Sequence, residues 1–182
     1  MLSLRFAAIM LLAVLFVRAG AKTQGQAPKQ ETSAGAKAPH NVPETCPVTK
    51  PSDPAFVPPS PYPAKPSGGD FWFGSGRLWT VLGTAGTWSG LPHYTPNDPT
   101  FRQKLFFWRE GYDYRAEPQP KLTITGRRLE GPAPPLLADQ ASGGWHDDSF
   151  MVTAINIPAL GCWEITGHYE DQNLSFVVWV TR

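Results

Sequence analysis

Between residues 70 and 182, apolar residues alternate with polar ones or stand in short bursts, and Gly, Pro, Asn or Asp interrupts them about every 8–15 residues. Alternation with a period of two is typical of β-strands, and no convincing helical pattern is present. We expect turns at Gly143-Gly144 and, in the last hairpin, at Asp171-Gln172-Asn173. The sequence therefore predicts an all-β domain of about seven or eight strands, near residues 71–73, 76–82, 86–89, 104–109, 121–129, 149–157, 162–169 and 173–181.

The chain before this domain divides into three parts. Residues 1–21 match a secretory signal peptide, because Arg5 precedes an apolar run that ends near Ala19-Gly20-Ala21. The run is shorter than the about 20 residues that cross a membrane, so we expect cleavage and no transmembrane span afterwards. Residues 22–45 predict a disordered tether, and residues 46–69 predict a proline-rich arm packed on the 70–182 domain, with further linker as the alternative. We expect a secreted or periplasmic protein.

The segment that begins the last hairpin resembles part of a known fold. Gly161, Trp163 and Ile165 are spaced like the Gly-x-Tyr-x-Cys that precedes strand F of immunoglobulin-like domains and forms their tyrosine corner. The resemblance implies an immunoglobulin-like antiparallel β-sandwich with these side chains in a core shared with Leu174, Phe176, Val178 and Val180. Trp163 replaces the tyrosine, so we expect the hydroxyl bond to the backbone to be missing. Ile165 stands where the cysteine that joins the two sheets would be.

The predicted export determines the expected state of the two cysteines. In an oxidising compartment a disulfide between Cys46 and Cys162 is favoured over two free thiols. The two-residue period of a strand points Cys162 away from the core, together with Glu164 and Thr166. The bridge would then pin the proline-rich arm onto the outer face of a sheet.

A narrower resemblance covers residues 46–180. Four segments together are similar to a family of exported bacterial proteins with no assigned function, a family that carries a Gly-Cys-Trp-Glu-(Ile/Val)-Thr motif. The resemblance implies export and a sandwich fold, and it brings no catalytic or binding residues. The segments are Cys46-Pro47-Val48-Thr49, Gly76-Arg77-Leu78-Trp79-Thr80, Gly126-Arg127-Arg128-Leu129 with Pro132-Ala133-Pro134-Pro135-Leu136, and Gly161-Cys162-Trp163-Glu164-Ile165-Thr166.

The charge balance argues against a nucleic-acid partner. The whole chain has 16 Lys and Arg against 15 Asp and Glu, and two of the arginines, Arg5 and Arg18, lie in the signal segment. Binding to phosphates requires a basic stripe. The nearest feature is the pair Arg127 and Arg128, which a strand would point to opposite faces.

No group of residues matches a catalytic or cofactor-binding template, so we expect no catalytic residue and no cofactor. The turn His146-Asp147-Asp148 is a weak candidate for a metal site, and a polar loop with local backbone hydrogen bonds is the favoured interpretation. His93 and His168 stand alone and are expected to be surface or hydrogen-bonded residues. The alternative to a non-enzymatic protein is a secreted hydrolase or metal-binding protein that uses the loop of His146 and Asp147.

Aromatic residues are more numerous than two inner sheet faces require, with 7 Trp, 7 Phe and 4 Tyr between residues 70 and 182. The run Leu105-Phe106-Phe107-Trp108 places large groups on both faces of one strand. The arm and long loops are expected to cover the outer ones, and the alternative is an exposed patch that binds a protein, a glycan or an envelope component. The candidate ligand surface comprises Trp79, Trp145, Trp179, Arg127 and Arg128. The prediction is a non-catalytic binding or accessory module.

Overall fold

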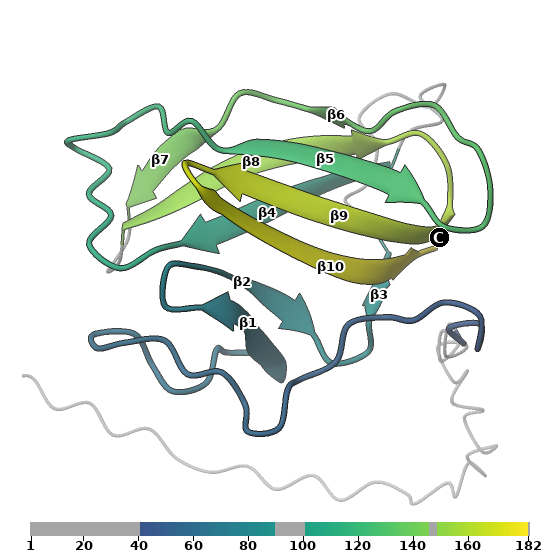
Figure 1. Ribbon diagram of the computed structural model, residues 1–182, viewed down its shortest axis with the longest axis horizontal. Helices are drawn as coiled ribbons and strands as arrows, with labels where there is room; N and C mark the ends of the chain where they lie inside the picture. The colour runs from purple at the N-terminus through teal and green to yellow at the C-terminus, as the bar shows by residue number, and fades with distance from the viewer. Residues whose placement is uncertain (1–40, 90–100, 146–148, 182) are drawn as a thin grey trace, which may run out of the picture. The chain divides into compact units, whose positions relative to one another are not determined.

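The computed structural model describes residues 41–89, 101–145 and 149–181, which belong to one compact unit. These residues form ten strands and no helix (Figure 1). The strands are β1 (Asp70–Ser75), β2 (Leu78–Gly83), β3 (Thr87–Trp88), β4 (Phe101–Trp108), β5 (Thr123–Arg128), β6 (Leu137–Ala138), β7 (Ser142–Trp145), β8 (Ser149–Ile157), β9 (Gly161–Tyr169) and β10 (Gln172–Val180).

The strands form two sheets packed face to face, and β5, β9 and β10 lie in front of β4 and β8 in Figure 1. The larger sheet has the order β1-β2-β4-β8-β6, and β7 also pairs with β8. The smaller sheet has the order β3-β10-β9-β5. Neighbouring strands are antiparallel except β3 and β10, which are parallel. The all-β sandwich architecture predicted from the sequence is confirmed.

The eight predicted strands all have counterparts, and two short strands were missed. The two residues of β6 are both exposed, so no alternation marks them. The pair Gly143-Gly144 lies within β7, and the prediction of a turn there is wrong because hydrogen bonding to β8 holds the glycines extended. In the described part of the chain no helix is long and apolar enough to span a membrane. The predicted signal peptide and the tether up to residue 40 lie outside the described residues.

The core lies between the sheets, as the period-two pattern predicts. Trp163 and Ile165 of β9 have no exposed surface, and they pack with the alternate residues of β10 that were expected there. The larger sheet contributes its own alternate residues to the same cluster, namely Phe71, Leu78, Leu82, Leu105, Phe107, Met151, Ile155 and Ile157. The longer strands of both sheets therefore have an inner face in the core and an outer face directed away from it.

Trp163 is bonded to the backbone through its indole nitrogen. Its indole N–H donates to the backbone carbonyl of Ala159, four residues upstream, at 2.9 Å. The hydroxyl bond of a tyrosine is absent, as expected, and the indole supplies a different hydrogen bond to the backbone. The bond fixes the chain where it enters β9.

The last hairpin turns one residue earlier than predicted. Tyr169 pairs with Gln172, so Glu170 and Asp171 form a two-residue turn. Glu170 has a φ of 52°, and no other non-glycine residue of the described segments has a positive φ. The register of β9 and β10 therefore places a glutamate in a conformation that favours glycine.

The arm, residues 46–69, is attached first to the smaller sheet. Cys46 and Cys162 form the predicted disulfide, and Cys162 lies on the outer face, opposite the inward Trp163. Thr49 then pairs with the free edge of β10: its N–H donates to the carbonyl of Val177 at 2.9 Å, and its hydroxyl accepts the N–H of Val177 at 2.8 Å. The arm and β3 thus pair with the same edge of β10, one after the other.

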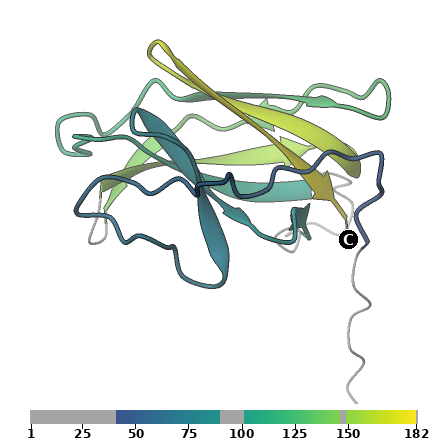
Figure 2. The ribbon, with the colours of Figure 1, turned by 60° about the horizontal axis from the view of Figure 1, so that its bottom comes forward.

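From there the arm crosses to the larger sheet, as the dark blue segment in Figure 2 shows. Before the crossing, Val48 packs on the backbone of Gly86, just before β3 of the smaller sheet, where an added Cβ would lie 2.7 Å from a methyl group of Val48. Farther along, Phe56, Tyr62 and Pro63 contact the outer face of β1 and β2. A chain segment without regular strands therefore covers parts of both sheets.

Candidate functional site: the outer face of the larger sheet

Aromatic side chains form a continuous row on the outer face of the larger sheet. The register places Trp72 of β1, Trp79 of β2 and Trp108 of β4 on this face, opposite the inward Phe71 and Phe107. Phe106 of β4 and Phe150 of β8 continue the row by the period of two. The row crosses four neighbouring strands of the sheet.

The rings touch one another along the row. The centroids of Trp72 and Trp108 are 5.2 Å apart in an edge-to-face arrangement. Phe106 lies 6.3 Å from Trp108 and 5.5 Å from Phe150, and Phe150 lies 6.2 Å from Trp108. These separations are those of favourable aromatic pairs. The four rings therefore form one contiguous aromatic cluster on this face.

The arm covers one half of this row. Trp79 has no exposed surface and lies under Tyr62 and Phe56, whose ring centroids are 5.2 and 6.1 Å from its own. Trp72 is 8% exposed, and its indole N–H donates to the carbonyl of Pro63 at 2.9 Å. The arm thus contacts this half both through rings and through a backbone acceptor.

The other half is partly exposed. Phe106, Trp108 and Phe150, together called the aromatic platform, each keep some surface accessible to solvent. The ring of Phe150 lies over the backbone of Gly144, where an added Cβ would be 2.1 Å from a ring carbon. The glycine in β7 therefore leaves the room that the ring of Phe150 occupies.

Beside the platform the sheet opens. β2 pairs with β4 only through Trp79 with Trp108 and Thr80 with Phe107, and the strands then separate. A cavity of about 320 Å³ lies in the gap, with Phe106 and the exposed Lys104 on its β4 side and Val81 on its β2 side. The platform is thus bordered by a cavity, and the cationic side chain of Lys104 lines that cavity.

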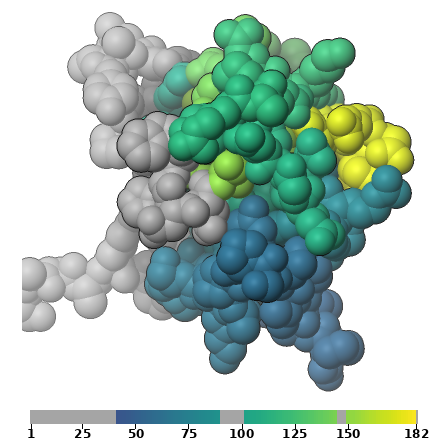
Figure 3. Space-filling model, turned by 90° about the vertical axis from the view of Figure 1, so that its left-hand side faces the viewer, coloured from purple at the N-terminus to yellow at the C-terminus, as the bar shows by residue number. Residues whose placement is uncertain are grey.

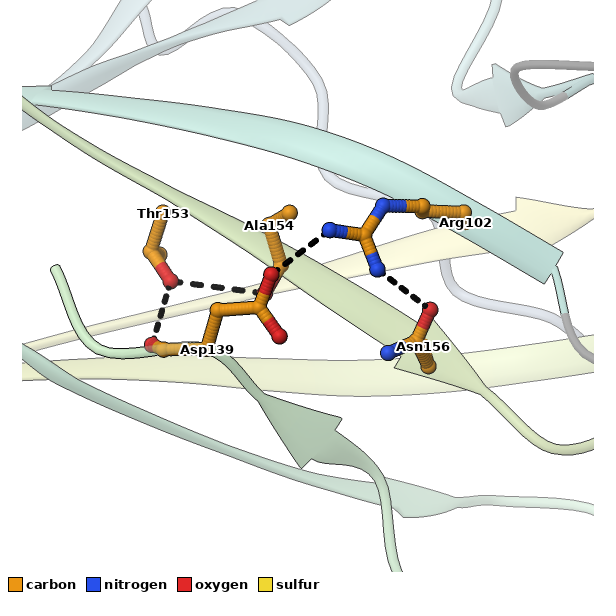
Figure 4. Close-up of polar contacts among 5 residues, drawn as sticks. All are labelled: Arg102, Asp139, Thr153, Ala154 and Asn156. Carbon is orange, nitrogen blue, oxygen red and sulfur yellow. Dashed lines mark hydrogen bonds and ion pairs between the residues drawn. The ribbon is translucent and has the colours of Figure 1, made fainter. Parts of the chain in front are cut away.

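At its other end the same face is polar. Arg102 of β4 donates to Asn156 of β8 at 3.1 Å and to the carboxylate of Asp139 at 2.6 Å (Figure 4). The hydroxyl of Thr153 donates to the backbone carbonyl of Asp139 at 2.8 Å, also drawn in Figure 4. Asp139 follows β6 directly. Its bonds to Arg102 and Thr153 therefore attach the chain after β6 to β4 and β8.

A second polar cluster lies where the β9–β10 turn meets the segment after β4; Figure 3 shows this end, with the hairpin tip in yellow. Tyr169 donates to the carboxylate of Glu117 at 2.5 Å, and Tyr112 donates to the backbone carbonyl of Glu117 at 2.8 Å. Arg109 lies over both rings, 5.4 and 5.9 Å from their centroids. The cluster ties residues 109–117 to β9.

Burial, supported by the nearby Glu117 carboxylate, raises the pKa of Tyr112 and of Tyr169 to about 12. Both hydroxyls therefore stay protonated near neutral pH and act as hydrogen-bond donors. In that state both tyrosines donate to Glu117, one to its carboxylate and the other to its backbone carbonyl.

The four predicted ligand residues that the structure describes lie on three different sheet faces. Trp79 is buried, so it adds no exposed surface. Trp179 is partly exposed on the smaller sheet, directly opposite Cys162. Arg127 lies on the same outer face and pairs with Glu164, whereas Arg128 lies on the opposite face, 3.4 Å from Glu130.

Most of the remaining candidates lie outside the described residues. The side chain of Trp145 and all of His146, Asp147, Asp148 and His93 lie outside the described residues. His168 is hydrogen-bonded to Thr125 and Asn173, as expected for a lone histidine. Within residues 41–89, 101–145 and 149–181, no group of three His, Cys, Asp or Glu could hold a metal ion.

The candidate ligand surface predicted from the sequence does not include Phe106, Trp108 or Phe150. The signal was present, because the run from Leu105 to Trp108 predicts large groups on both faces of β4. The sequence does not say that the arm would cover Trp79 and leave Trp108 partly open.

Comparison with known proteins adds no relative: the chain matches no protein-family model, no curated protein and no solved structure. The resemblance to a family of exported bacterial proteins stays a prediction.

Proposed function

We propose that this protein is an exported, non-catalytic binding module whose ligand contacts the aromatic platform. The observation that carries the proposal is that Phe106, Trp108 and Phe150 stay partly exposed in a row whose other half is covered by the arm. Soluble proteins rarely leave contiguous large aromatic surface open, and such surface commonly marks an interaction site. Aromatic rings are also the residues that dominate binding energy at interfaces.

The proposal includes an immunoglobulin-like topology. In that fold, strands A, B, E and D form one sheet and C, F and G the other. The order β2-β4-β8-β6 supports the first assignment, and β5-β9-β10 supports the second. The bond from Trp163 to Ala159, at the place of the tyrosine corner, supports it further. Domains of this kind serve as scaffolds for many unrelated binding functions, so the ligand must be argued from the surface.

Export is the second part of the proposal. The disulfide between Cys46 and Cys162 supports an oxidising compartment, since such bonds are rare in the cytosol. The signal-like residues 1–21 support the same compartment. We propose a secreted or periplasmic location, with a protein, a glycan or another envelope component as the partner.

The test compares two tryptophans on different sheets. Trp108→Ala removes the centre of the platform, and the matched control Trp179→Ala removes a partly exposed tryptophan from the smaller sheet. Both purified variants are titrated by calorimetry with soluble envelope polysaccharides and with extended peptides. We expect at least one probe to bind the natural protein and the Trp179→Ala variant, and to lose about tenfold or more in affinity with Trp108→Ala. Equal losses in the two variants would refute the proposed surface.

A further inference from the structure

We propose that the free edge of β5 pairs with an extended strand of a partner polypeptide. The added strand runs antiparallel to β5, points its alternate apolar side chains into a cavity beside the edge, and carries an acidic residue next to Lys121. The edge belongs to the smaller sheet, whereas the aromatic platform lies on the larger one. It is therefore a second binding site, independent of the proposed function of the platform.

The backbone of β5 has unpaired hydrogen-bonding groups on the side away from β9. The N–H of Leu129 donates to the carbonyl of Cys162, and such bonds recur at every second residue of an antiparallel pair. The residues between them direct their N–H and carbonyl groups to the free edge, where these groups have no hydrogen-bond partner among the described residues. They are Ile124, Gly126 and Arg128. An edge of this kind is a template for another strand.

The other sheet edges are short, occupied or irregular. β3 and β6 have two residues each, and the arm pairs with the edge of β10 beside β3. In β7 the N–H of Gly143 donates to the carbonyl of Pro118 at 2.8 Å. β1 contains Gly74, whose φ of 142° departs from that of a regular strand. Among the edge strands that the structure describes, β5 thus has the longest regular free edge, with six residues and no proline.

A cavity of about 480 Å³ lies beside this edge, between residues 119–124 and residues 138–141. β6 runs near β5 here but does not pair with it (Figure 1). Ala138 of β6 stands opposite the buried Ile155 and so lies on the inner side of its sheet, yet it is exposed. The sandwich is therefore open between the two strands. An antiparallel strand on β5 points every second side chain to the same side as Ile124, into this opening.

The charges along the edge favour a partner polypeptide over a second copy of this chain. Between residues 121 and 129 there are three basic residues and no acidic one. Both arginines are paired with glutamates, whereas Lys121, which is exposed and lines the cavity, makes no ion pair with a described residue. Two copies of β5 paired antiparallel would bring Lys121 of one copy close to the arginines of the other, which is unfavourable. A strand with an acidic residue near Lys121 is complementary.

The experiment uses a short strand-forming peptide as the probe. The peptide has eight residues, alternates valine and threonine, and ends with glutamate, because the end of an antiparallel strand lies beside Lys121. It is titrated into the ¹⁵N-labelled exported protein, and amide hydrogen exchange is measured by NMR. We expect the amides of Ile124, Gly126 and Arg128 to exchange about tenfold or more slowly with saturating peptide. The β5 amides bonded to β9 are the internal control and should keep their rates.

Two comparisons make the result specific to the edge. With valines on the cavity side, the valine amides bond to β5, so methylation of these amides should abolish binding. Methylation of the threonine amides, which face away, should leave the affinity nearly unchanged. Lys121→Gln should lower the affinity about two- to fivefold, whereas the matched control Lys104→Gln, which changes an exposed lysine of the larger sheet, should have no effect.

Three outcomes would overturn this assignment: no slowing of exchange at millimolar peptide, equal binding of the two methylated peptides, or slow exchange of the three edge amides in the free protein that increases with protein concentration. The last would assign the edge to a second copy. The platform is tested separately by Trp108→Ala, and the indole signal of Trp108 should stay in place throughout the peptide titration.

Discussion

The indole N–H of Trp72 donates a hydrogen bond to the backbone carbonyl of Pro63, 2.9 Å away, and so joins the proline-rich arm to the larger sheet. At the other end the disulfide of Cys46 joins the arm to the smaller sheet. The arm is thus held at both ends by different chemistry. It is part of the fold, and its path determines which aromatic residues remain accessible.

Loss of the disulfide should destabilise the protein substantially. The bridge spans a sequence separation of 116 residues, for which chain entropy gives about 4–5 kcal/mol as an upper figure. The double variant Cys46→Ser/Cys162→Ser should therefore unfold at a clearly lower urea concentration than the natural protein. An unchanged midpoint, or alkylation of both cysteines without reductant, would contradict the bridge.

The hydroxyl of Thr49 should contribute to stability on its own. Thr49→Ala leaves the N–H of Val177 without its acceptor, so we expect a loss of about 1 kcal/mol in the free energy of unfolding. Thr49→Ser keeps the hydroxyl and serves as the matched control. Hydrogen exchange of the Val177 amide should accelerate in the alanine variant only; equal exchange in both variants would argue against arm pairing at this edge.

The turn of the last hairpin offers a stabilising substitution. Glu170 has a positive φ, and glycine adopts that conformation without the steric cost of a side chain. After allowance for the greater entropy of glycine in the unfolded chain, Glu170→Gly should raise stability by about 0.5–1 kcal/mol. Asp171→Gly is the control and should give no gain. A decrease in the melting temperature of Glu170→Gly would contradict the turn described.

Alkaline pH should weaken the fold through two tyrosines. The pKa of Tyr112 and that of Tyr169 are raised from 10.0 to about 12 in the folded protein. From pH 10 to 12 the unfolded chain loses these protons while the folded chain keeps them, so stability falls as pH rises. The loss should be roughly 2 kcal/mol per tyrosine, measured by urea unfolding at each pH, and it should be smaller in Tyr169→Phe. A flat profile would show that the hydroxyls are not held as described.

The sequence predicted the strands well because alternation is a local property. In β9 and β10 each residue's face follows from its position, and Trp163, Ile165, Phe176 and Val178 lie in the core as expected. The arrangement of β7 escaped prediction because Gly143 and Gly144 carry no side chain to alternate. Only the ladder with β8 holds them extended.

The sequence predicted large aromatic side chains on the outer sheet faces, but not which of them stay exposed. Trp79 and Trp108 both lie on the outer face of neighbouring strands. The residues next to each of them in the sequence do not indicate which one is covered. Their difference in exposure arises from Phe56 and Tyr62, which reach Trp79 from the arm. Such contacts between distant segments depend on the tertiary structure and cannot be read from spacing.

Coverage of Trp72 and Trp79 by the arm is tested most directly by residue-level hydroxyl-radical footprinting of the exported protein, read by mass spectrometry. We expect Trp108 and Phe106 to be oxidised readily, and Trp72 and Trp79 to react about as slowly as the core residue Trp163. If Trp72 and Trp79 react as fast as Trp108, the arm does not cover that half of the sheet.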